Sequence, residues 1–294
     1  MPSEGTPQQR VASSAPADGQ ERMLRRLYGS SLGRGVLKLI VRPWFSKAGG
    51  WLINRKVSCL WIKRFVRNNS IDLSECEKSR FKSFNDFFTR RLRPGSRTVD
   101  MDSDHFISPC DSRLTAYKID SRARFWIKDT QYSLSELIRN YEIAKRFEGG
   151  WLLLFRLSVD DYHRYCYVDD GHKLADVRIP GLFHTVNPIA NDLYPIYKEN
   201  SRVYSLMQTR NFGEVLAIEV GALLVGKITN HDPAECYVAR GREKGLFEFG
   251  GSTIVICVQD GVLDIDEPIA SNSAANIETK VRYGSRVGVR RATR

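Results

Sequence analysis

The sequence predicts an α+β fold, in which a single β-rich domain follows a basic, amphipathic helical region near the N-terminus. Two patterns support this prediction. Residues 22–67 place basic and apolar side chains at approximately helical spacing, whereas after Phe88 the chain turns to short β-branched or apolar runs separated by Gly, Asp and Pro. With 294 residues, 42% of them hydrophobic, the chain can bury a full core in one or two domains.

Residues 1–21 are expected to form a disordered tail outside the fold. Pro, Ser and Gln are frequent in this segment, and it lacks the apolar core of a signal peptide. No stretch approaches the roughly 20 uncharged apolar residues that span a bilayer. The best candidate, residues 35–45, is interrupted by Lys38, Arg42 and Pro43.

Residues 22–80 form the predicted basic amphipathic region, and the charge of its first part has one sign. Between residues 22 and 67 there are twelve cations and no acidic residue. The cations are Arg22, Arg25, Arg26, Arg34, Lys38, Arg42, Lys47, Arg55, Lys56, Lys63, Arg64 and Arg67. Trp, Phe and Leu alternate with them, a pattern typical of helices that lie in a membrane interface. The alternative is a pair of helices packed on the domain with basic outer faces.

The β-rich domain is predicted to span residues 81–294. Its expected strands are residues 113–119, 151–157, 216–220, 222–228 and 253–258. One helix is expected at residues 133–141, because Ser133 is a suitable N-cap and Glu136 stands three residues later, as in a capping box.

Charge and cysteine content limit the partners. A net charge of +11 favours an anionic partner: nucleic acid, a membrane surface or an acidic substrate. No helix-turn-helix, RNA-binding or zinc-finger pattern is present, so we expect no nucleic acid. Six cysteines without CxxC pairing are typical of reduced thiols in the cytosol, and no metal site is expected.

A serine that follows two glycines is the most informative local feature. Gly250-Gly251-Ser252-Thr253 directly precedes the apolar run 254–258, which indicates a tight turn that leads into a buried strand. Because glycines lack a Cβ, the carbonyl of Gly251 can bend towards the Ser252 hydroxyl. Attack of the hydroxyl on the chain's own backbone then becomes feasible.

Several other blocks occur in a characteristic order around this serine. They are FNDFFTRRLRPG at residues 84–95, ISPCDSR at 107–113, FRLSVDDYHRY at 155–165, VNP at 186–188, NSRV at 200–203 and VGALLVG at 220–226. From about residue 84 to residue 288, the order and spacing closely resemble the phosphatidylserine decarboxylases. These are pyruvoyl enzymes made as one proenzyme that cuts itself before a serine.

The resemblance implies a role for each of four residues. Ser252 would attack the carbonyl of Gly251, and His163 would act as its general base. Asp111 matches the family's acidic position and would orient the imidazole, as the third member of a Ser-His-Asp triad does. Cleavage between residues 251 and 252 would leave a large β chain, a small α chain and a covalent pyruvoyl group derived from Ser252.

The resemblance also implies a substrate and a location. The pyruvoyl ketone would act as the electron sink for conversion of phosphatidylserine to phosphatidylethanolamine and carbon dioxide. The protein would be a peripheral membrane enzyme, bound to an anionic membrane surface on its cytoplasmic face. Its α and β chains would stay associated, and a homodimer remains open.

One departure from the family pattern concerns the base. Many members have a second histidine three residues after the first, where this chain has Cys166. A neutral thiol substitutes poorly for imidazole, so His184 or His172 is an alternative base. Two other functions therefore stay open: an uncleaved, inactive lipid-binding homologue, and a serine hydrolase, which is disfavoured because the Gly-x-Ser-x-Gly elbow is absent.

Overall fold

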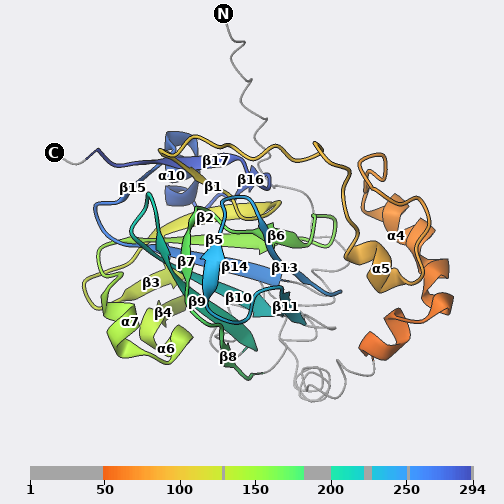
Figure 1. The fold of residues 1–294 in the computed structure, drawn as a ribbon, viewed down its shortest axis with the longest axis horizontal. Coiled ribbons are helices and arrows are strands. Elements are labelled where there is room, and N and C mark those ends of the chain that lie inside the picture. The colour runs from red at the N-terminus through yellow and green to blue at the C-terminus, as the bar shows by residue number, and fades with distance from the viewer. Residues whose placement is uncertain (1–48, 128–129, 182–199, 222–226, 250–251, 293–294) are drawn as a thin grey trace, which may run out of the picture.

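A nine-stranded antiparallel sheet forms the centre of the molecule (Figure 1). The computed structural model describes residues 49–127, 130–181, 200–221, 227–249 and 252–292. The sheet has the order β12-β7-β9-β10-β14-β5-β2-β16, and β8 pairs with β9. Its strands are β2 (Ser112–Lys118), β5 (Trp151–Leu157), β7 (Gly171–Lys173), β8 (Val177–Ile179), β9 (Arg202–Thr209), β10 (Glu214–Gly221), β12 (Cys236–Val238), β14 (Ser252–Val258) and β16 (Thr279–Val281).

Smaller sheets complete the domain. One has the order β11-β13-β6, one the order β1-β17-β15, and β3 pairs with β4. The strands are β1 (His105–Ile107), β3 (Arg124–Ile127), β4 (Thr130–Ser133), β6 (Arg164–Cys166), β11 (Ile228–Asn230), β13 (Glu243–Phe247), β15 (Leu263–Ile265) and β17 (Arg286–Arg290). The helix α10 (Glu267–Ala274) lies against β2 and β16.

The core lies on both faces of β14, in which every residue is buried. Val255 and Cys257 belong to one apolar cluster, whereas Ile254, Ile256 and Val258 belong to another. This split follows from the two-residue period of a strand, because successive side chains point to opposite faces of the sheet. A strand buried on both faces explains the continuous apolar run in the sequence.

The described part of the basic region begins with helical residues 49–53 and continues as η1 (Lys56–Trp61) and α4 (Ile62–Asn68), and α5 (Phe84–Phe88) follows in the predicted domain. Figure 1 shows these elements at one end of the molecule, beside the sheets. Ile53, Ile62 and Phe84 are buried together in a third apolar cluster. Part of the basic region therefore packs on the domain, as the alternative reading of the sequence expected.

The predicted helix at residues 133–141 forms in two pieces, α6 (Leu134–Ile138) and α7 (Tyr141–Lys145). Between them Arg139 adopts a left-handed conformation with φ of 53°, which ends α6 early. Ser133 is the N-cap residue, but its side chain makes no capping hydrogen bond. Asn140 caps α7 instead, and its side chain accepts a hydrogen bond from the N–H of Ile143.

The predicted α+β fold class is confirmed. Strands occupy four of the five predicted segments, and residues 151–157 coincide with β5. The fifth segment, residues 222–228, lies mostly outside the described residues. All six cysteines are described, and each is a free thiol.

Candidate active site

Ser252 is the first residue of β14, at the centre of the large sheet. β14 lies between β10 and β5, where Ser252 is in register with Gly221 and Leu157. The Ser252 side chain is fully buried. Within the described residues its hydroxyl has no hydrogen-bond partner. Gly250 and Gly251, the two residues before it, lie outside the described residues.

The sheet topology brings His163 to the connection that leads into Ser252. Two of the connections between the large sheet and the sheet of β6, β11 and β13 concern the site: residues 158–163 join β5 to β6, and residues 248–251 join β13 to β14. Because β5 pairs with β14 and β6 pairs with β13, the two connections begin and end on neighbouring strands. The N–H of Phe247 donates to the carbonyl of His163 at 2.9 Å, which fixes the two segments together.

The His163 ring is buried and is held from one side only. Its Nδ1 lies 2.9 Å from the carbonyl oxygen of Asp161, which can only accept, so Nδ1 carries the proton. The Nε2 atom is therefore an acceptor, and it has no partner within the described residues. The Phe88 ring lies over the imidazole, with 4.0 Å between ring centroids. Burial, with a smaller contribution from the Arg90 charge, lowers the pKa of His163 to about 3.

Asp111 lies directly before β2 and has different partners. Both of its oxygens accept from Arg97, with distances of 2.6 to 3.0 Å, and Oδ1 accepts from the N–H of Tyr283 at 2.8 Å. The structure thus links Asp111 to Arg97 and Tyr283, whereas the atom that orients His163 is the carbonyl of Asp161. The orienting role expected of the Asp111 carboxylate stays a prediction.

Asp161 is a residue of this site that the sequence reasoning missed. Its carboxylate accepts from the N–H of Ser158 at 2.6 Å and lies 3.7 Å from Arg113. Burial and the neighbouring charge of Asp160 raise the pKa of Asp161 to about 7, although Arg113 opposes this shift. The same residue therefore holds His163 through its backbone and carries a carboxyl that titrates near neutral pH.

Asn85 on α5 is a second missed residue, and it holds the chain just before the glycine pair. Its Oδ1 accepts from the N–H of Phe249 at 3.1 Å, and its Nδ2 lies 3.4 Å from Glu248. Phe249 also packs edge-on against Phe84 and Phe88, with ring centroids 4.9 and 5.0 Å apart. The sequence signal was the FNDFF block, although the block alone does not reveal which segment α5 contacts.

Cys166 occupies a buried position on β6. Its thiol is 4.0 Å from the carbonyl oxygen of Ser108, and burial raises its pKa to about 12. The thiol is thus protonated at neutral pH and cannot act as a base. Cys166 packs within the apolar cluster that also contains Ile254 and Phe247.

His172, one of the two alternative bases, lies far from Ser252. His172 on β7 is in register with Gln208 on β9, and Gln208 is in register with Glu214 on β10. Glu214 lies beside the C-terminal end of β14, whereas Ser252 is at its N-terminal end. At about 3.3 Å per residue, the register separates His172 from Ser252 by about 23 Å along the strand direction alone. His172 instead forms an ion pair with Glu235 at 3.0 Å. His184 lies outside the described residues.

Comparison with known proteins assigns the chain to a family. The model of the family described as phosphatidylserine decarboxylase matches residues 84–289. The chain belongs to the phosphatidylserine decarboxylase family. The match includes Ser252, His163 and Asp111, and it confirms the resemblance that the sequence blocks indicated.

Curated relatives of the family match nearly the whole chain. A protein named phosphatidylserine decarboxylase proenzyme 2 from Clostridium acetobutylicum is 45% identical over 90% of this chain and 91% of its own length. Proteins named phosphatidylserine decarboxylase proenzyme from Ruminiclostridium cellulolyticum and Desulfitobacterium hafniense are 41% and 39% identical. These two matches cover 91% and 93% of this chain, and 91% and 94% of the relatives. Among the described helices, none is long and apolar enough to cross a membrane.

Proposed function

We propose that this chain is a proenzyme that cuts itself between Gly251 and Ser252 and then decarboxylates phosphatidylserine to phosphatidylethanolamine. The observation that supports this most directly is a pair of buried atoms in a family member, Ser252 Oγ at the start of β14 and His163 Nε2 on the connection that follows the neighbouring strand β5. Neither atom has a hydrogen-bond partner among the described residues. A nucleophile and a base with free acceptor capacity are what serinolysis requires.

In the self-cleavage step, the Ser252 hydroxyl attacks the carbonyl carbon of Gly251. Neutral His163 accepts the hydroxyl proton at Nε2, while the Asp161 carbonyl holds the ring through Nδ1. The backbone nitrogen of Ser252 leaves the carbonyl carbon and gains a proton, so the amide becomes an ester. Loss of the Cα proton of residue 252 then expels the Gly251 carboxylate and leaves dehydroalanine. Addition of water and release of ammonia give the pyruvoyl group.

The residues around position 252 fit such a group. The pyruvoyl ketone supplies an electron sink for the bond to the departing carboxylate. Gly221, opposite Ser252 in register, adds no side chain to the space beside it. Buried His163 and Phe88 keep water away from one side, and His163 in its neutral form can accept a proton at Nε2.

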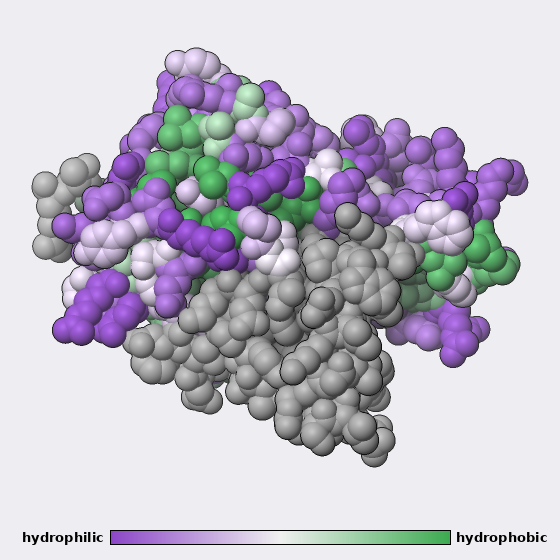
Figure 2. Space-filling view, turned by 90° about the horizontal axis from the view of Figure 1, so that it is seen from below, coloured by the Kyte–Doolittle hydropathy of each residue, from purple (hydrophilic) through white to green (hydrophobic). Residues whose placement is uncertain are grey.

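A peripheral membrane location is part of the proposal. Large apolar side chains are exposed on helical residues 49–53 and on η1, and we call them the interfacial patch: Trp51, Leu52, Val57, Leu60 and Trp61. Figure 2 shows hydrophobic surface at this end of the molecule, bordered by hydrophilic residues. Basic residues flank the patch, and the guanidinium of Arg55 lies 4.3 Å above the Trp51 ring. An anionic leaflet, such as the cytoplasmic one, matches this combination.

The alternative function is that of an uncleaved lipid-binding homologue. The buried, protonated thiol at Cys166 is the observation that favours it, because a second histidine is missing there. A serine hydrolase stays disfavoured, since the sequence around Ser252 lacks the Gly-x-Ser-x-Gly elbow.

Intact-mass analysis of the purified protein tests the proposal. Cleavage is expected to yield residues 252–294, a chain of 43 residues with an N-terminal pyruvoyl group. The Ser252→Ala protein should remain one chain of 33.6 kDa. Release of carbon dioxide from phosphatidylserine should accompany cleavage in the wild type and be absent from the variant. A wild-type protein that stays intact, with an unmodified serine, would exclude the pyruvoyl mechanism.

A further inference from the structure

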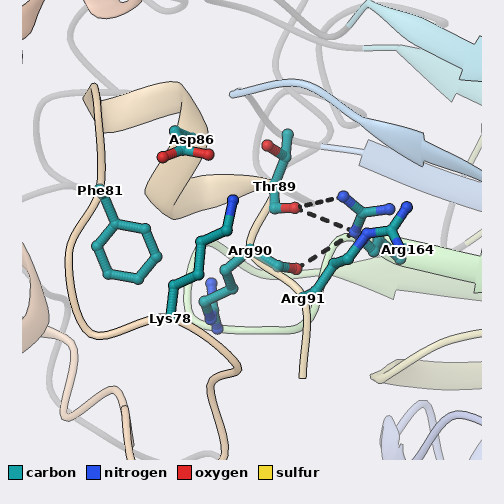
Figure 3. Close-up of a pocket in the computed structure, with 7 residues that line it drawn as sticks. All are labelled: Lys78, Phe81, Asp86, Thr89, Arg90, Arg91 and Arg164. Carbon is teal, nitrogen blue, oxygen red and sulfur yellow. Dashed lines mark hydrogen bonds between the residues drawn. The ribbon is translucent and has the colours of Figure 1, made fainter. Parts of the chain in front are cut away.

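A cationic cavity lies next to the loop that carries His163. It has a volume of about 80 Å³, several times the space that one ordered water needs. Four cations line it, Lys78, Arg90, Arg91 and Arg164, together with one acidic residue, Asp86 (Figure 3). In Figure 3 the Lys78 ammonium points towards the end of α5, where Asp86 and Thr89 lie. Size and charge both suit a small anionic group.

The charge of this cavity is only partly compensated. Arg164 donates to the carbonyl of Thr89 at 2.8 Å and to Glu243 at 2.6 Å, so its charge is paired. Asp86 accepts a hydrogen bond from the main chain of Lys82 at 2.8 Å. Among the described residues, the side chains of Lys78 and Arg91 have neither an ion-pair nor a hydrogen-bond partner.

Arg90 is the most unusual member of the cavity. Its side chain is only 6% exposed, and its Nη2 makes long contacts of 3.3 and 3.5 Å with the carbonyl oxygens of Asp160 and Asp161. In the described part of the chain, its Nε and Nη1 have no hydrogen-bond partner and no carboxylate forms an ion pair with it. A buried guanidinium without an acidic partner is unfavourable unless an anion completes the site.

We propose that this cavity binds the phosphate of the phospholipid headgroup while the serine end reaches residue 252. This inference rests on the proposed function. In a phosphoserine unit four covalent bonds separate the amino nitrogen from phosphorus, at most about 5 Å. A substrate whose amine reacts beside His163 must therefore place its phosphate among the neighbours of His163.

The contacts of Asp161 place one residue of the cavity, Arg90, beside the imidazole. Its carbonyl oxygen lies 2.9 Å from His163 Nδ1 and 3.5 Å from Arg90 Nη2, so Arg90 and the imidazole share one acceptor. On its other side the cavity reaches Phe81, which packs in the same apolar cluster as Ile53 and Ile62 of the basic region. The proposed phosphate site thus lies between the proposed membrane-facing end of the molecule and His163. The headgroup of a membrane lipid that reacts beside His163 would occupy the same position.

The decisive variant is Lys78→Ala/Arg91→Ala. Both side chains are exposed, so the fold should be retained. With short-chain phosphatidylserine below its critical micelle concentration, the KM should rise about tenfold or more, because charge-assisted contacts to the phosphate are lost. The kcat should change much less. A Lys78→Arg/Arg91→Lys protein, which keeps both charges, should retain the wild-type KM.

Arg80→Ala/Lys82→Ala is the matched control. These residues are exposed cations of the same segment, they do not line the cavity, and their loss changes the net charge equally. The control should keep the wild-type KM. If the KM of the Lys78→Ala/Arg91→Ala protein equals that of the control, the inference is overturned.

A second arm separates the lipid phosphate from free phosphate. Inorganic phosphate should inhibit the soluble reaction competitively, and its inhibition constant should rise in Lys78→Ala/Arg91→Ala along with the KM. Weaker phosphate inhibition with an unchanged KM would make the cavity a site for free anions and contradict the inference. Self-cleavage involves no phosphate, so the variant should process normally. An uncleaved or inactive wild type would instead contradict the proposed function.

Discussion

His163 and Ser252 each have a buried polar atom with no hydrogen-bond partner in the described part of the chain. A buried group without a hydrogen bond costs about 1 to 3 kcal/mol, so a fold selected for stability alone would pair them. Arg90, Ser112 and Thr253, which lie near the same end of the sheet, also carry unpaired buried atoms. Because these unpaired buried atoms lie near one another, we expect the reacting groups to bind there.

The pH dependence of self-cleavage is the prediction at this scale. Burial lowers the pKa of His163 to about 3, so the base stays neutral far below its ordinary range. Titration of His163 should therefore cause no inflection of the cleavage rate near pH 6.5. An inflection near pH 7 is expected from Asp161, whose pKa is raised to about 7, and Asp161→Asn should remove it. Denaturing gels of samples quenched at successive times, between pH 5 and 8, would measure the cleavage rates of the wild type and of the Asp161→Asn protein.

A rate that falls tenfold per pH unit below pH 6.5 in the Asp161→Asn protein would contradict this prediction.

The lowered pKa of His163 also has a consequence for stability. Because the folded pKa of His163 lies below its unfolded value, its contribution to the free energy of unfolding is present above pH 6.5. That contribution is lost as the pH falls towards 3, since only the unfolded state binds the proton readily.

At the scale of elements, α5 is short but contacts both Phe249, just before the glycine pair, and the His163 ring. Its Asn85 binds the main chain of Phe249, and its Phe88 covers His163. The Ser83 hydroxyl caps α5 by accepting from the N–H of Asp86 at 3.1 Å. The helix thus sets the position of His163, the proposed base, relative to Phe249.

We predict that Asn85→Ala slows self-cleavage roughly tenfold to a hundredfold, because small misplacements of reacting groups cost rates of this order. Asn69→Ala is the matched control, since Asn69 donates to the carbonyl of Phe65 at 2.8 Å in α4, away from the cleavage site. Cleavage should be followed after cell-free synthesis, together with Tm. If both variants cleave at the same rate, α5 does not position the site.

The strands could be predicted from the sequence because a doubly buried strand such as β14 requires a continuous apolar run. The N-terminal boundary of α6 was also predictable, but its end at Arg139 was not, since a left-handed arginine has no strong local signal. Ser252, His163 and Asp111 came from motifs. The contact of Asn85 with Phe249 joins residues 164 positions apart, and the raised pKa of Asp161 depends on burial, so only the fold reveals them.

At the scale of the whole molecule, the interfacial patch gives a prediction for membrane binding. Deletion of residues 22–67 would be ambiguous, because Ile53 and Ile62 are buried against Phe84. Substitution of Trp51, Leu60 and Trp61 by Ala removes side chains that are 60%, 78% and 46% exposed instead. Binding to anionic vesicles in co-sedimentation should fall about tenfold or more, since each exposed large apolar side chain contributes on the order of 1 kcal/mol or more on burial. Self-cleavage should be unchanged.

Met101→Ala/Tyr237→Ala is the control for this experiment. These residues are 67% and 81% exposed and lie outside the patch. Loss of apolar surface there should leave vesicle binding as in the wild type. Equal binding by the patch variant and the control would show that residues 49–61 serve only to pack on the domain.

The central place of β14 has a further consequence for the folding of the mature enzyme. After cleavage, β14 would belong to the small chain yet remain paired with β5 and β10, while β16 pairs with β2 and β17 with β1. Before the cut, covalent linkage keeps these strands at a high effective concentration, so folding is first order. After the cut, the denatured large chain must meet the 43-residue small chain by diffusion. Refolding then becomes second order, and its rate depends on protein concentration. The precursor is then the only form that folds efficiently, and the mature enzyme persists through slow unfolding.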